Sequence, residues 1–124
     1  MVISEKIDKS TVLSFQEVRN LDAPKAFRIK AEFRALITEP NVKLVVDLTD
    51  VDFIDSAGIG VLLSGLRMVK GQDGQMKLCS LSATIFDLFM LLRLEHVFEI
   101  FVNREQAIAS YLSVQRLRER EKDA

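Results

Sequence analysis

One stretch, residues 44–60, constrains the fold more than any other part of the chain. It begins with Leu44 to Leu48, a largely branched apolar run of the kind that fills a buried strand. An acidic loop follows, then Ser56, then Gly58 and Gly60 at the start of a helical repeat of apolar residues. This pattern predicts a strand, a loop and a helix. Ser56 is predicted to be the N-cap, because a serine hydroxyl can accept a hydrogen bond from a free N–H group of the first turn.

The two glycines leave the predicted first turn without bulky side chains. We therefore expect another molecule to be able to approach Ser56 closely. This favours a regulated hydroxyl over a purely structural one.

The remaining segments predict an α/β domain with a mixed sheet of about five strands and about four helices. An opening hairpin is expected from Met1 to Ile7 and Thr11 to Val18, since both segments are rich in strand-forming residues and a polar turn joins them. Later strands and helices then alternate. The expected elements are an amphipathic helix after Asp22, strands Val42 to Leu48, Met76 to Leu81 and Val97 to Val102, a helix Ala83 to Leu94 capped by Ser82, and a last helix from Arg104 capped by Asn103.

Length and composition predict one small domain, 1–112, followed by a charged helix end or tail, 113–124. Seventeen basic and eighteen acidic residues nearly cancel, so no charge footprint for nucleic acid or an anionic membrane is expected. The only cysteine, Cys79, lies in an apolar segment and is predicted to be a buried reduced thiol. Because the start of the chain lacks a signal-peptide core, we expect a cytoplasmic protein. No apolar run is long enough to span a bilayer.

A family resemblance rests on the same central stretch. The sequence from Phe53 to Gly60, preceded by Val45 to Leu48, resembles the signature of STAS-domain anti-sigma factor antagonists of the SpoIIAA and RsbV type. Three further segments resemble the acidic turn after the family's second strand, the entry to its last strand and the start of its last helix: residues 21–23, 94–100 and 103–107.

This resemblance implies a phosphorylation switch. In the family, the unphosphorylated antagonist binds an anti-sigma factor that is also a serine kinase of the histidine-kinase-like ATPase fold, and sigma factor is released. Phosphorylation of the antagonist ends binding, and a PP2C-type phosphatase restores it. By motif position Ser56 is the phosphorylated residue, and Asp22, Asp55, Ala57 and Gly58 belong to the docking surface. A monomer or weak homodimer is expected.

The chain departs from its relatives at several positions. Ala57 stands where many relatives have a second hydroxyl residue, which points to Ser56 alone as the acceptor. Arg19 and Arg93 occupy places where glycine is common. Phe86 and Met90 share a helix face where relatives tend to be charged. Two interpretations remain open for this pair: extra core or a dimer seam, and a contact patch for the partner.

An enzyme is the main alternative class, and the sequence argues against it. The third glycine of a dinucleotide-binding turn is replaced by Leu63, and Ser56 does not lie in a G-x-S-x-G motif. His96 is the only histidine, so no metal cluster is expected, and the acidic loop more simply serves capping and solvation than cation binding. We expect no catalytic activity, cofactor or metal. The other alternative is a non-switching STAS scaffold or an accessory subunit of a stress-signalling or transport complex, with Ser56 only a helix cap.

Overall fold

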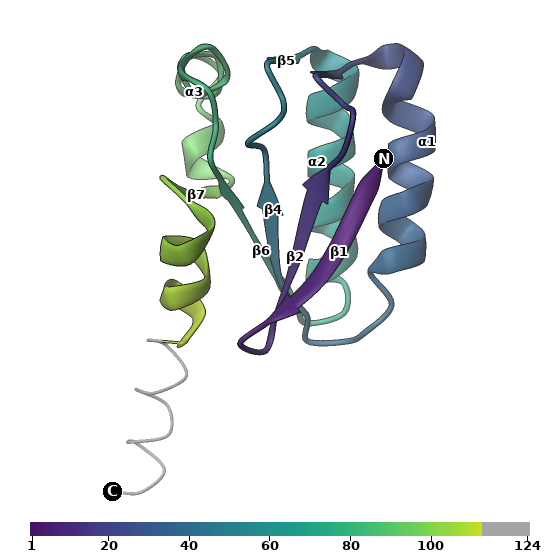
Figure 1. Ribbon diagram of the computed structural model, residues 1–124, viewed down its shortest axis with the longest axis vertical. Helices are drawn as coiled ribbons and strands as arrows, with labels where there is room; N and C mark the ends of the chain where they lie inside the picture. Colours follow the sequence, from purple (N-terminus) through teal and green to yellow (C-terminus); the bar gives the residue numbers. More distant parts are fainter. Residues whose placement is uncertain (113–124) are drawn as a thin grey trace, which may run out of the picture.

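A computed structural model describes residues 1–112 and shows a five-stranded mixed sheet with helices on both faces (Figure 1). β1 and β2 are antiparallel, and the other three pairings are parallel. In the order in which they pair, the strands are β1 (Val2–Ile7), β2 (Ser10–Phe15), β4 (Lys43–Asp47), β6 (Gln75–Cys79) and β7 (Glu99–Phe101). The predicted α/β class and mixed sheet are confirmed. The predicted tail, 113–124, lies outside the described residues.

The opening hairpin is confirmed, with a tighter turn than expected. Ile7 pairs with Ser10, so only Asp8 and Lys9 form the turn. Both have positive φ, 48° and 68°, as a type I′ turn requires. β2 ends at Phe15 instead of continuing to Val18, and Glu17, with a φ of 61°, marks the bend beyond it.

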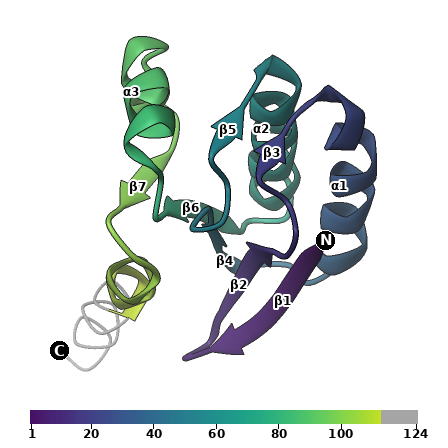
Figure 2. The same cartoon turned by 45° about the horizontal axis from the view of Figure 1, so that its top comes forward.

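One face of the sheet is covered by α1 (Ala23–Leu36) and α2 (Ser56–Lys70), which lie side by side in both views (Figures 1 and 2). Alternate strand residues point to this face because successive side chains of a strand project to opposite sides. The core here joins strand side chains to the apolar faces of the two helices, including Leu44, Val46, Leu78, Ile29, Phe33, Leu62, Leu66 and Val69.

The opposite face is covered by the helical segment 104–112, where Val12, Val45 and Cys79 pack against Ala107, Ile108 and Tyr111. As predicted, Asn103 caps this helix: its Oδ1 accepts a hydrogen bond of 2.9 Å from the Gln106 N–H. The Cys79 thiol is free and buried, and burial raises its pKa to about 12. The expectation that this cysteine is buried is confirmed.

The third helix is shorter than expected. α3 spans Ala83–Leu91, with Ser82 as the predicted cap accepting a 3.2 Å hydrogen bond from the Ile85 N–H. It ends before Leu94 because Arg93 adopts a left-handed conformation, with φ 58°. A short 3-10 helix, η1 (Leu94–His96), follows. This backbone conformation explains why glycine suits the Arg93 position.

No helix among residues 1–112 is both long enough and apolar enough to cross a membrane.

Candidate functional site

Two loops meet where the chain enters α1 and α2. The second sheet consists of only two short parallel strands, β3 (Asn20–Leu21) and β5 (Phe53–Ile54). The carbonyl of Arg19 accepts hydrogen bonds from the N–H groups of Asp52 and Phe53, at 2.8 and 3.2 Å. Each strand leads directly into a helix, so the pairing places the starts of α1 and α2 next to each other (Figure 2).

Asp55, and not Ser56, is the N-cap of α2. Its Oδ1 accepts a hydrogen bond of 3.0 Å from the Gly58 N–H. Its Oδ2 accepts another of 3.0 Å from the Ala23 N–H, at the start of α1. One carboxylate therefore joins the N-termini of two helices. The prediction of Ser56 as the cap is wrong, because aspartate and serine are comparably good caps and the two residues are adjacent.

The surroundings of Asp55 favour its charged form. The hydrogen bond from Gly58 is the largest cause of a lowered pKa; partial desolvation opposes it, and the Ala23 N–H adds to it. Two helix N-termini also present the positive ends of their dipoles to this carboxylate. Asp55 therefore carries a negative charge at neutral pH.

Ser56 is the first residue of α2 and is exposed. Within the described residues its hydroxyl has no hydrogen-bond partner. Ala57, beside it, is half-buried. Asp22 is the N-cap of α1, and its carbonyl accepts hydrogen bonds from the first turn of that helix. The Asp22 carboxylate lies 3.6 Å from Lys25 Nζ. Asp22, Asp55, Ser56 and Ala57 are thus brought together at one end of the domain.

Gly58 does not have the predicted role. It is buried, and a Cβ there would overlap the carbonyl oxygen of Leu21 and lie 2.7 Å from Ile54 Cγ1. Its missing side chain lets α2 approach β3 and β5 and does not open a path to Ser56. A Cβ added at Gly60 would meet open space. Of these two glycines, Gly60 is therefore the one that leaves the surface unobstructed, as expected.

Comparison with known families matches residues 3–107 to the STAS domain. The chain belongs to the STAS-domain family. A Bordetella bronchiseptica protein named as the anti-sigma factor antagonist BtrV is 28% identical over 107 residues, which cover 86% of this chain and 90% of that protein.

Solved structures share the STAS fold across different functions. A domain protein of Planctomyces limnophilus described as an anti-sigma-factor antagonist superposes with a TM-score of 0.81 and 22% identity, covering 88% of this chain and 96% of that chain. The murine anion transporter Slc26a9 superposes with a TM-score of 0.75 and 14% identity, over 88% of this chain but 18% of the transporter. A function for this STAS domain must therefore be argued from its site.

A second polar cluster anchors the start of the loop that leads to Ser56. Asp47, at the end of β4, accepts a 3.0 Å hydrogen bond from the Thr49 N–H and a 2.9 Å bond from Arg104 Nε. Arg104 also lies 3.4 Å from Glu5. Burial raises the pKa of Asp47, but the Thr49 hydrogen bonds and Arg104 outweigh it and lower the pKa overall. No sequence motif marks this cluster, because its members are far apart along the chain.

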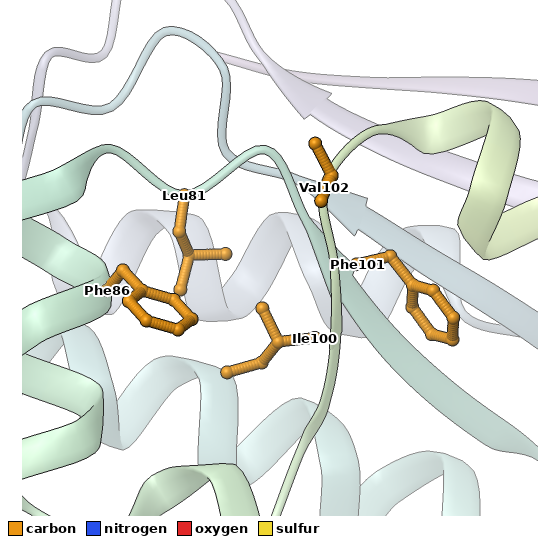
Figure 3. Close-up of a pocket in the computed structure, with 5 residues that line it drawn as sticks. All are labelled: Leu81, Phe86, Ile100, Phe101 and Val102. Atoms are coloured by element: carbon orange, nitrogen blue, oxygen red, sulfur yellow. The ribbon is translucent and has the colours of Figure 1, made fainter.

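Phe86 and Met90 lie on α3, which contacts β5, the short strand that leads to Ser56. Their exposed fractions, 42% and 45%, exclude the interpretation of both as core residues. Phe86 lines a shallow apolar groove of about 200 Å³ between α3 and the edge strand β7. Leu81, Phe86 and Ile100 point toward the same space, whereas Phe101 points away from it (Figure 3).

The structure does not place the lone histidine, His96, in a metal site within residues 1–112. His96 is exposed and lies 3.3 Å from Glu95 Oε1. Among residues 1–112, no three His, Cys, Asp or Glu side chains are grouped as metal ligands would be.

Two of the three glycines of α2, Gly58 and Gly60, should change the stability in opposite directions when they are replaced by alanine. Gly58→Ala should lower the free energy of unfolding by about 1–3 kcal/mol, because the new methyl group overlaps Leu21. Gly60→Ala should raise it by up to about 1 kcal/mol, because alanine is the better helix former and nothing obstructs it. Urea unfolding followed by circular dichroism measures both. Equal effects of the two substitutions would contradict the internal role of Gly58.

Proposed function

We propose that this STAS domain is an anti-sigma factor antagonist that works as a phosphorylation switch in the cytoplasm. The unphosphorylated form binds an anti-sigma factor that is also a serine kinase of the histidine-kinase-like ATPase fold, and sigma factor is released. Phosphorylation of Ser56 ends the binding, and a PP2C-type phosphatase reverses it. The domain acts by binding and does not itself catalyse a reaction. The observation that carries the proposal is the exposed hydroxyl of Ser56 at the first position of α2, which has no hydrogen-bond partner among residues 1–112.

The position of Ser56 suits a group that is modified without unfolding the domain. The residue is exposed, so a phosphate there stays in water and does not enter the core. It also sits at a helix N-terminus, where the dipole favours an anion. The fold should therefore tolerate the modification.

The same phosphate should be poorly tolerated by a docked partner. It adds about −1.5 to −2 charges at neutral pH. The neighbouring Asp55 is already charged, and exposed Asp50 and Asp52 precede it on the loop. A partner that fits the unmodified surface would have to desolvate the phosphate, which is costly without new donors. The sequence relationship to antagonists such as BtrV supports this interpretation.

Incubation with a soluble extract of the source organism and ATP tests the switch. Intact-protein mass should show the gain of one phosphoryl group in the wild type and none in Ser56→Ala. Ser64→Ala, which removes a hydroxyl two turns further along α2, serves as the matched control and should still be modified. An unmodified wild type in an extract with demonstrably active kinases would contradict the proposal and favour a non-switching scaffold.

We also propose that Phe86 and Met90 form an additional contact for the same partner. Both are exposed apolar side chains on α3, and Phe86 opens onto the groove beside β7. Exposed apolar clusters of this kind often mark interfaces.

Replacing both Phe86 and Met90 by glutamate should weaken partner binding about tenfold or more, since apolar anchors carry much of the binding energy of an interface. The free energy of unfolding should change by less than about 1 kcal/mol, because both side chains are exposed. Leu36→Glu, an exposed apolar position at the far end of α1, is the control and should bind normally. Unfolding of the double variant, or unchanged affinity, would contradict the proposal.

A further inference from the structure

We propose that Asp55 transmits the phosphorylation of Ser56 to the start of α1, so that the modification alters two loops instead of one. This inference rests on the proposed function, in which Ser56 carries the phosphate. Asp55 is then a positioning residue, and its role is to hold the second loop in the arrangement that the partner recognises.

The start of α1 depends on Asp55 for a specific reason. Asp22 is the N-cap of α1, but its side chain makes no capping hydrogen bond. Pro24, in the first turn, has no N–H group to offer. The N–H groups of Lys25 and Ala26 are bound by the Asp22 carbonyl, at 3.0 and 2.9 Å. The Ala23 N–H is therefore the donor that remains, and in the described chain its acceptor is Asp55 Oδ2.

A phosphate on Ser56 competes directly with this arrangement. It is attached to the residue next to Asp55, and it brings three strong acceptor oxygens to the same helix N-terminus. The two anions repel each other, because Asp55 is held in its charged form. The phosphate can replace Asp55 as the acceptor for the Gly58 N–H on its own helix. Ala23 belongs to the other helix and loses its acceptor when the carboxylate is displaced.

Loss of this bond would alter the surface around Asp22. The Lys25 ammonium lies 3.1 Å from the Asn20 carbonyl and 3.6 Å from Asp22, so the first turn of α1 and the end of β3 are held together there. Release of the Ala23 N–H removes the side-chain tie between this turn and the Ser56 loop, whereas the 3.2 Å backbone hydrogen bond from the Asp55 N–H to the Leu21 carbonyl remains. The phosphate therefore changes the shape of the proposed docking surface as well as its charge.

Amide hydrogen exchange at Ala23 tests the inference in the full-length protein. Phosphoserine is incorporated at position 56 during translation, so no kinase is needed. NMR then compares the unmodified and phosphorylated forms of the wild type and of Asp55→Asn. The Ile85 N–H, bound by Ser82 on α3, is the matched reference for a capped helix start far from the modification.

In the wild type, phosphorylation should speed Ala23 exchange about ten- to a hundredfold, as expected for loss of a hydrogen bond to a charged group, and leave Ile85 unchanged. In Asp55→Asn, Ala23 should already exchange rapidly, and phosphorylation should add little. Unchanged Ala23 exchange in the phosphorylated wild type would overturn the inference. So would fast exchange in the unmodified wild type, or equal acceleration with Asn at position 55.

Because the phosphate is built in, a wild type left unmodified by the active kinases of the extract would contradict the proposed function without affecting this result. Conversely, a phosphorylated Ser56 with an unaffected Ala23 amide would leave the switch in place and remove only the coupling.

Discussion

The arrangement of the candidate site depends on two hydrogen bonds from backbone N–H groups to one carboxylate. Asp55 accepts from Gly58 on α2 and from Ala23 on α1, both at 3.0 Å. Without it, the two-residue strands β3 and β5 would be the main tie between the loops, and such short pairings are weak alone. Gly58 completes the junction by letting α2 approach the Leu21 carbonyl. Ser56 is held at the surface because its neighbours on both sides are fixed.

The sheet contributes by placing these loops on a rigid base. The segment from β4 to α2 leaves the sheet at Asp47, which is anchored through Arg104 to the helix on the opposite face. The loop that precedes Ser56 is therefore held at its start by the helix on one face of the sheet, and it continues into α2 on the other face. The fold itself is shared with an anion transporter, so the fold alone does not specify a function.

Much of the fold follows from periodicity and caps in the sequence. The apolar strands, the helical repeats and the caps Ser82 and Asn103 could be read directly, because each depends on residues close together in the chain. Asp55 and Gly58 could not be assigned correctly. Their roles depend on contacts with Ala23 and Leu21, more than thirty residues away. The exposure of Phe86 and Met90 could not be predicted either, because it depends on which distant parts of the chain pack against α3.

The most direct test of the proposed switch is the affinity of the proposed serine-kinase partner, once purified, for this protein with and without phosphoserine at position 56. Isothermal titration calorimetry should show binding of the unmodified protein and an affinity at least about a hundredfold lower for the phosphorylated one, since an added dianion must be desolvated at the interface. Circular dichroism should show the same fold for both. Equal affinities for the two folded forms would contradict the account.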